Sequence, residues 1–332
     1  MSAVLLQRVG VVAIGRNEGA RLQRCLRSLP SGLARVVYVD SGSTDGSVEF
    51  ARGASAEVVA LDMSTPFTAA RARNAGWQRL VALEPGVTFV QFLDGDCELD
   101  TGFLPAAMAV LDAEPEVAVV CGRRREVAPA DSVFNRLCDM EWNTPVGDAA
   151  ACGGDALMRV SALRAVGGYD PTLIAGEEPE LCLRLRRAGH RIRRIDAEMT
   201  RHDAAIERWS QWWLRNARAG HAYAEGFHRY GREPEQLYRR EVASNAVWGM
   251  GLPALSLGLA LPTLGGSLSL LGLYGVLYRR IRADRLSRGD SPEDATLYAT
   301  YTVLGKVPQA RGAVQFYARL LRREQASLIE YK

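Results

Sequence analysis

The stretch Thr88–Asp100, TFVQFLDGDCELD, joins a run of apolar, β-branched and aromatic residues directly to a cluster of carboxylates. The run is continuous and does not alternate with polar residues, which predicts a strand covered on both faces. Asp94 and Asp96 follow it with only Gly95 between them. Because like charges this close repel each other, the pattern requires compensation by a divalent metal, by arginines or by the solvent around a turn.

Five apolar runs share this continuous character and alternate with segments of helical period. They are VGVVAI (9–14), RVVYVD (35–40), EVVAL (57–61), TFVQFLD (88–94) and VAVVCG (117–122). This alternation predicts an α/β fold, with a doubly wound, mostly parallel sheet flanked by helices. Ligands bind such sheets at the carboxyl ends of the strands, where Asp40 and Asp94 both fall, so we expect these two carboxylates to converge on one crevice.

Composition narrows the class of protein. The net charge of +3 over 332 residues argues against a dedicated nucleic-acid binder. The cysteines show no CxxC pair and no ligand spacing, which predicts buried free thiols in a reducing compartment and neither a zinc site nor a disulfide framework. The N-terminus has no charged region before an apolar stretch, so we expect no secretory signal. The six cysteines are Cys25, Cys97, Cys121, Cys138, Cys152 and Cys182.

The segment Asn245–Tyr278 contains no charged residue and is flanked on both sides by arginine-rich sequence. PTLGG (262–266) offers a turn in its middle. We therefore expect a helical hairpin that dips into or crosses the membrane from its cytoplasmic face, which would anchor the chain there. The alternative is an apolar helix pair packed on the preceding domain.

The predicted domain organisation has four parts. Residues 1–205 form the α/β domain, 206–243 a helical connector, 244–280 the hydrophobic hairpin and 281–332 an amphipathic tail. The tail interleaves arginine with aromatic residues, so it would lie on an anionic leaflet or dock on the α/β domain.

Acidic and small residues gather at the predicted strand ends, whereas no GxxxxGK[ST] loop, GxGxxG turn or nucleophile elbow is present. Carboxylates at alternate positions, as in Asp94-Gly95-Asp96, can hold one hard cation together with phosphate oxygens. Arg73 lies on a predicted helix and could face a phosphate. Glu178 opens another helix in GEEPE, either as an ordinary helix-start acid or as a general base.

Together, these motifs resemble the family 2 glycosyltransferases with the GT-A fold, over about residues 8–205. The resemblance rests on RNE (16–18), the Asp after the second strand, DGD (94–96), GGDALMRVSALRAVGGYD (153–170) and GEE (176–178). It implies a nucleotide site at Ala13, Asn17, Glu18, Asp40, Ser41, Arg73, Asn74 and Asp94. It implies Mn²⁺ or Mg²⁺ at Asp94, Asp96 and His202, acceptor and donor-sugar contacts from Gly153, Gly154, Asp155 and Trp142, and a catalytic base at Glu178 or Glu177.

Two departures from the family pattern qualify these expectations. Glu177-Glu178 stands where Glu-Asp is usual, which leaves open which of the two is the base, and the QxxRW signature of processive relatives is missing. The resemblance implies an inverting, non-processive transfer from a UDP- or GDP-sugar to a hydroxyl acceptor, lipid-linked or membrane-associated. The alternatives are a sugar-1-phosphate nucleotidyltransferase, which would want a glycine-rich basic loop in place of IGRNEGAR (14–21), and a non-catalytic membrane-tethered binding protein.

Overall fold

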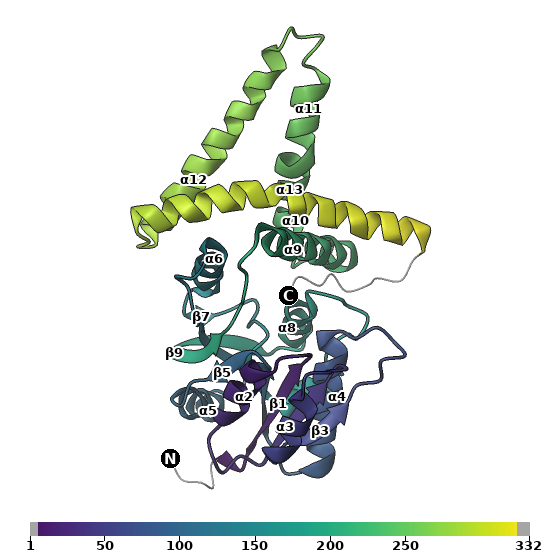
Figure 1. The fold of residues 1–332 in the computed structure, drawn as a ribbon, viewed down its shortest axis with the longest axis vertical. Helices are drawn as coiled ribbons and strands as arrows, with labels where there is room; N and C mark the ends of the chain where they lie inside the picture. Colours follow the sequence, from purple (N-terminus) through teal and green to yellow (C-terminus); the bar gives the residue numbers. More distant parts are fainter. Residues whose placement is uncertain (1–5, 324–332) are drawn as a thin grey trace. The chain divides into compact units, whose positions relative to one another are not determined.

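The computed structural model describes residues 6–323 of the chain, and these form two compact units (Figure 1). Unit 1 consists of residues 6–129 and 141–205, and it contains the sheet. Unit 2 consists of residues 130–140 and 206–323, and it is helical. The short segment 130–140 belongs to unit 2 although residues on both sides of it belong to unit 1.

Unit 1 is built on a nine-stranded mixed sheet with the order β3-β2-β1-β4-β8-β6-β9-β5, and β7 also pairs with β9. Strands β3, β2, β1 and β4 run parallel, β8 runs antiparallel to both β4 and β6, and β6 and β9 are parallel. The strands are β1 (Val9–Gly15), β2 (Arg35–Asp40), β3 (Glu57–Ala60), β4 (Phe89–Asp94), β5 (Cys97–Leu99), β6 (Val117–Glu126), β7 (Gly147–Asp148), β8 (Ala156–Arg159) and β9 (Arg191–His202).

Helices cover this sheet and bury its apolar strands, as the continuous apolar runs predict. The helices of unit 1 are α2 (Ala20–Arg27), α3 (Ser47–Gly53), α4 (Ala69–Leu83), α5 (Phe103–Ala113), α7 (Val160–Ala165) and α8 (Glu177–Arg187). Val11 and Val12 of β1 and Phe92 and Leu93 of β4 are fully buried, which places both faces of these strands in the core. The five predicted strands are all present, within a few residues of their expected bounds.

The predicted mostly parallel sheet is wrong in its second half, where the sheet is mixed. A parallel neighbour needs a crossover connection, usually a helix, on one face of the sheet. β8 instead enters from the loop after β7 and runs against both of its neighbours. Its four residues, ALMR, include no β-branched or aromatic residue and so give no strand signal, and β5 has only three residues.

Unit 2 is a set of packed helices. They are α6 (Val133–Trp142, which begins in this unit), α9 (Trp209–Tyr230), α10 (Arg239–Ala246), the π-helical turn η1 (Val247–Gly251), α11 (Leu252–Gly258), the 3₁₀ segment η2 (Gly266–Gly272), α12 (Leu273–Ser287) and α13 (Pro292–Arg322). Phe134 of α6 stacks on Trp212 of α9 with ring centroids 6.0 Å apart, and Tyr301 of α13 meets both rings edge-on. These aromatic contacts join three helices of the unit.

The predicted membrane hairpin at 244–280, and with it the predicted anchoring of the chain, is overturned. Within residues 6–323, no helix combines the length and the apolar character that a membrane span requires. The apolar stretch is broken into η1, the seven residues of α11, a turn and η2. At about 1.5 Å per residue, α11 is about 10 Å long, against a hydrocarbon core of about 30 Å. α12 is longer, but its second half carries arginines.

We expect Gly312→Ala to lower the free energy of unfolding of unit 2 by about 1–3 kcal/mol, because overpacking forces backbones apart. A Cβ at Gly312 of α13 would lie 1.9 Å from the carbonyl oxygen of Ala217 on α9, and one at Gly220 of α9 would lie 1.9 Å from that of Gln309. Gly275→Ala is the matched control, because its Cβ would meet open space. Chemical denaturation of both variants tests the prediction, and equal stabilities would contradict it.

Candidate active site

The carboxyl ends of β1, β2 and β4 lie together at one edge of the sheet. Gly15 of β1 is in register with Asp40 of β2, and Ile14 with Asp94 of β4. The chain turns directly after β4, where the Gly95 amide donates to the Ile14 carbonyl at 2.8 Å. The two carboxylates therefore lie at neighbouring strand ends, as the sequence predicts.

Asp40 is buried and organises the loop that follows β2. Its Oδ2 accepts hydrogen bonds from the amides of Gly42 and Ser43, both at 2.9 Å, and Oδ1 accepts from the Tyr38 hydroxyl. Asn17 takes the same role from β1, because its Oδ1 accepts from the Thr44 amide at 2.7 Å. Asp40 and Asn17, which the sequence predicts to contact a nucleotide, therefore hold loop 41–45 in its conformation.

The other predicted residues near β1 and β2 lie close by. Ala13 is fully buried within β1, and the amide of the buried Ser41 donates to the Gly15 carbonyl at 3.0 Å. Glu18 forms an ion pair with Arg21 at 2.9 Å. The side chains of Ala13 and Ser41 therefore support the strand ends from within the core.

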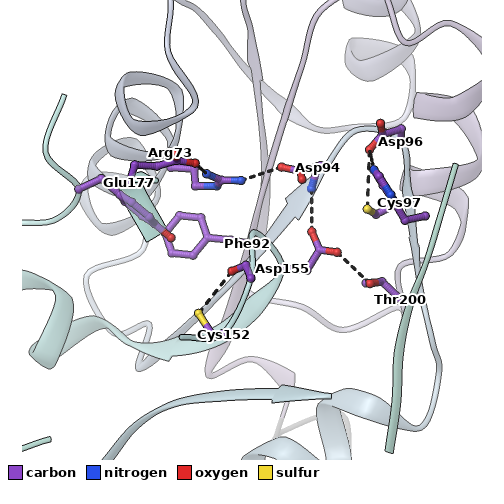
Figure 2. Close-up of polar contacts among 12 residues, drawn as sticks. Arg73, Phe92, Asp94, Asp96, Cys97, Cys152, Asp155, Glu177 and Thr200 are labelled. Atoms are coloured by element: carbon purple, nitrogen blue, oxygen red, sulfur yellow. Dashed lines mark hydrogen bonds and ion pairs between the residues drawn. The ribbon is translucent and has the colours of Figure 1, made fainter. Parts of the chain in front are cut away.

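Arg73 of α4 is the central cation of the site, with only 3% of its side chain exposed. Its Nη2 lies 2.8 Å from Asp94 Oδ1, and its Nη1 lies 2.7 Å from Glu177 Oε1 (Figure 2). It thereby joins the end of β4 to the first turn of α8. Burial opposes the charge of the guanidinium, but the two carboxylates outweigh this and raise its pKa above the usual value. Arginine is thus one part of the compensation that the carboxylate cluster requires.

A second buried network holds Asp94 from the side of β8. Asp155 is completely buried, and its Oδ1 accepts from the Asp94 amide at 3.1 Å. Its Oδ2 accepts from the Thr200 hydroxyl at 2.8 Å (Figure 2). The same oxygen pairs with Arg124 Nη2 at 2.8 Å. Arg124 also approaches Asp94 at 4.0 Å. Although burial raises the pKa of Asp94, Arg73 and Arg124 hold that pKa below its usual value.

Asp96 faces His202 across the short antiparallel pair of β5 and β9. His202 Nε2 lies 3.2 Å from Asp96 Oδ1, and both side chains are buried. Cys97, opposite His202 in the register, places its Sγ 3.7 Å from the same oxygen. The Trp142 ring packs edge-on against the His202 ring, with their centroids 4.7 Å apart. The guanidinium carbon of Arg124 lies 5.4 Å from the centroid of the Trp142 ring. Trp142 therefore contacts the side chains of the candidate metal site directly.

The donor set of this corner fits a divalent cation. Asp96 and His202 offer ligand atoms within 4.8 Å of one another, together with Cys97, and Asp94 lies two residues before Asp96 but not within that group. Carboxylate oxygens and an imidazole nitrogen are ligands that Mn²⁺ or Mg²⁺ accepts. His202 Nδ1 is buried and has no hydrogen-bond partner within the described part of the chain. Gly154 lets the backbone approach this corner closely, because a Cβ there would lie 2.8 Å from Arg73 Nη2 and 3.0 Å from Asp94 Oδ2. Its neighbour Gly153 has a φ of +84°, a conformation that favours glycine.

The two candidate bases have different surroundings. Glu177 is paired with Arg73, whereas Glu178 Oε1 accepts from the Cys152 amide at 2.5 Å and from Cys182 Sγ at 3.0 Å. Burial raises the pKa of Glu178 above its usual value, and these hydrogen bonds offset only part of that rise. A buried carboxylate with a raised pKa accepts a proton more readily than an ordinary one, so Glu178 has the properties of a general base.

Asn74 and Arg124 differ most from what the sequence indicates. Asn74 does not face the crevice: its Nδ2 donates to the Tyr169 carbonyl at 2.7 Å, and its Oδ1 accepts from the Tyr169 amide. It thereby fixes the loop of the VGGYD motif. Arg124 was not predicted, and its only signal is the run RRRE at the end of an apolar strand.

Comparison with known proteins gives a consistent result. Residues 11–165 match the family model described as "Glycosyl transferase family 2". The chain is 30% identical over 191 residues to the succinoglycan biosynthesis protein ExoA of Rhizobium meliloti. This alignment covers 53% of this chain and 57% of ExoA. It is 31% identical over 208 residues to a pre-mycofactocin glycosyltransferase of Mycobacterium tuberculosis, covering 59% of this chain and 42% of that protein. The chain thus matches about half the length of these relatives.

Solved structures share the fold. The mannosyltransferase PcManGT of Pyrobaculum calidifontis, in complex with GDP-Man and Mn²⁺, aligns with a TM-score of 0.57 at 19% identity, over 93% of this chain and 87% of that chain. Glucosyl-3-phosphoglycerate synthase of M. tuberculosis, with Mg²⁺ and UDP, aligns with a TM-score of 0.51 at 18% identity, over 70% of this chain and 84% of that chain. At these identities the likeness establishes the GT-A fold alone.

Proposed function

We propose that this chain, which has the GT-A fold and whose residues 11–165 match the family 2 glycosyltransferases, is a metal-dependent, inverting glycosyltransferase. It would move one sugar from a nucleotide diphosphate sugar to a hydroxyl group of an acceptor. The donor would be a UDP- or GDP-sugar. Neighbours that share the fold are complexes with GDP-Man or UDP and with Mn²⁺ or Mg²⁺, which supports this class of donor and cofactor.

One observation carries the proposal: a continuous chain of contacts joins the candidate metal ligands to the candidate bases. Asp94 lies at the end of β4, two residues before Asp96, and Arg73 joins it to Glu177 at the start of α8. Glu178 follows Glu177 directly. A candidate phosphate-binding corner is thus linked to a candidate proton acceptor, which supports the transfer of a sugar from a diphosphate.

The residues that would hold the cation are Asp94, Asp96 and His202. When bound, the cation would neutralise diphosphate oxygens and stabilise the departing nucleoside diphosphate. Arg73 and Arg124 add positive charge beside the same corner, and the carboxylates that they contact raise the pKa of both guanidinium groups. Gly154 lets the backbone pass close to Asp94 and Arg73.

Glu178 would take the proton from the acceptor hydroxyl as that oxygen attacks the anomeric carbon from the side opposite the diphosphate. A single displacement of this kind inverts the anomeric configuration. Glu177 is less suited to the role because its carboxylate is already paired with Arg73 at 2.7 Å. We propose that Glu177 instead holds the Arg73 side chain in place between α4 and α8.

For the acceptor, we propose a single hydroxyl-bearing saccharide, consistent with the missing processive signature. ExoA, the relative named above, is described as a succinoglycan biosynthesis protein, which supports an acceptor of this class. The expectation of a lipid-linked or membrane-associated acceptor rested on the membrane hairpin, and it loses that support. Trp142 lies beside His202 at the rim of the corner, where its ring could stack on a sugar.

Calorimetric titration with UDP and with GDP, each with and without Mn²⁺, tests the donor site. We expect Mn²⁺ to strengthen the binding of one nucleotide about tenfold or more, because the cation bridges the diphosphate to Asp94 and Asp96. Asp96→Ala should abolish this gain. Asp112→Ala should retain it, because Asp112 is an exposed carboxylate paired with Arg8. Binding that is equal with and without Mn²⁺ for both nucleotides would contradict the proposal.

A further inference from the structure

Two cysteines that are 30 residues apart in sequence meet beside the candidate base. Cys152 lies in the loop between β7 and β8, and Cys182 lies one helical turn after Glu178 on α8. The two sulfur atoms are 3.7 Å apart, and Cys182 Sγ is 3.0 Å from Glu178 Oε1. The exposed fractions are 8% for Cys152, 7% for Glu178 and 0% for Cys182.

The sulfur–sulfur separation matches a metal site better than a disulfide. A disulfide bond is about 2.05 Å long, far shorter than 3.7 Å. Two thiolates on one tetrahedral zinc ion, with Zn–S distances of about 2.3 Å, lie about 3.8 Å apart. The carboxylate oxygen of such a site would lie about 3.6 Å from each sulfur, so Glu178 needs to retreat by about half an ångström from Cys182.

We propose that Cys152, Glu178 and Cys182 form a second cation site, separate from the donor site, for a thiophilic divalent cation of the zinc class. The three ligand atoms already lie within 4.8 Å of one another. Two thiolates and a carboxylate, with water as the fourth ligand, are ligands typical of zinc and unlike those of Mg²⁺. The exposed residues Ala151 and Gly153 flank Cys152 and give the loop an open side for entry.

Binding of a cation to this site requires both thiols to lose their protons. Burial raises the pKa of both thiols, so each must give up a proton that it holds at neutral pH. Two protons leave for each cation bound, and affinity therefore rises with pH. The Cys152 amide, which donates to Glu178 at 2.5 Å, would keep one carboxylate oxygen oriented toward the site.

A consequence for activity follows, and this part rests on the proposed function. A carboxylate that ligates a cation cannot accept the proton of an acceptor hydroxyl, so occupancy of this site would inhibit transfer. Zinc would then be an inhibitor at this site while Mn²⁺ supports the reaction at Asp94 and Asp96. The soft ligand pair discriminates between the two cations.

Cobalt titration of the whole chain tests the site without any measurement of activity. Co²⁺ replaces Zn²⁺ at thiolate sites and gives thiolate-to-cobalt charge-transfer absorption in the near ultraviolet. We expect this absorption in the wild type, about half of it in Cys182→Ser or Cys152→Ser, and none in the double variant. Serine keeps a hydroxyl that can donate to Glu178, so the fold should be retained, as circular dichroism would confirm.

Two further cysteine variants make the assignment specific. Cys97→Ser removes the thiol beside Asp96 and His202, and Cys25→Ser changes a fully buried thiol elsewhere in unit 1; both should leave the absorption unchanged. Loss of the absorption in Cys97→Ser, or its persistence in the double variant, would overturn the proposal, as would its absence from the wild type. These outcomes do not depend on nucleotide binding.

Competition with a chromogenic chelator then gives the affinity for Zn²⁺ in the wild type and the serine variants. We expect each serine substitution to weaken Zn²⁺ binding about tenfold or more, since even residues that only support a ligand cost that much. Inhibition of transfer by Zn²⁺ should weaken in parallel. If the site binds Zn²⁺ but no nucleotide binds the chain, the proposed function fails and the cation site stands.

Discussion

Replacing Arg73 with methionine is expected to lower the free energy of unfolding of unit 1 by about 2–4 kcal/mol, somewhat less than the cost of breaking a fully buried ion pair, because both carboxylates are partly exposed. The side chain is 3% exposed and holds Asp94 at 2.8 Å and Glu177 at 2.7 Å. Methionine fills a similar volume but leaves both carboxylates without their cation. Asp94 still has Arg124 at 4.0 Å, whereas Glu177 loses its ion-pair partner.

Arg79→Met is the matched control, because Arg79 lies on the same helix and pairs with Glu57 at the surface. Exposed pairs of this kind contribute about 0–1 kcal/mol. Adding Glu177→Gln to Arg73→Met should recover part of the lost stability, since it removes one uncompensated charge. Urea denaturation of the four proteins gives these values directly. A single Arg73→Met variant within about 1 kcal/mol of the wild type would show that the pair does not stabilise the fold.

The sheet edge could be predicted from the sequence because two strong local signals coincide there. Continuous apolar runs identify β1, β2 and β4, and a carboxylate directly after a buried strand is unusual enough to indicate a site. The placement of Asp40 and Asp94 at adjacent strand ends follows from those signals and from parallel pairing. This placement can be predicted without any knowledge of contacts between residues that are distant in sequence.

Contacts between distant segments could not be predicted in the same way. Arg73 looks like an ordinary helix arginine in sequence, and its burial depends on α8 approaching α4 from more than a hundred residues away. Arg124 and Asp155 meet through the antiparallel insertion of β8, which contains no β-branched or aromatic residue to indicate a strand. These residues carry most of the charge compensation around Asp94.

The expectation of a membrane hairpin failed for a related reason. The uncharged stretch 245–278 was interpreted from its lack of charge, its central turn and its arginine-rich flanks, but α11 within it has only seven residues. The cysteines are buried free thiols, as the sequence predicts, but their spacing is informative only for ligands on one hairpin or loop. Cys152 and Cys182 come together because a loop and a helix of unit 1 converge on Glu178.

The same carboxylate gives the prediction with the largest effect on the reaction. Glu178→Gln should lower kcat about 10²–10⁴-fold, the range associated with general acid–base catalysis, while the binding of the nucleoside diphosphate is retained. Glutamine keeps the shape of the side chain and an oxygen that can accept from the Cys152 amide. It cannot accept a proton. The measurement is the rate at which the nucleoside diphosphate is released from the sugar nucleotide. The calorimetric titration with UDP and GDP identifies which nucleotide to use.

Glu177→Gln separates the two candidate bases, since it removes the charge that faces Arg73 and leaves Glu178 in place. We expect Glu177→Gln to lower kcat less than Glu178→Gln does, and the reverse order would assign the base to Glu177.

The pH dependence of the wild-type activity gives an independent test of the base. A base works only when deprotonated, and burial raises the pKa of Glu178, so wild-type activity should fall on acidification at a higher pH than an ordinary carboxylate would give. In Glu178→Gln the residual activity should lose this acidic limb, because the group that titrates there is gone. An unchanged limb in the variant would mean that another group controls the rate, whatever the size of the loss in kcat.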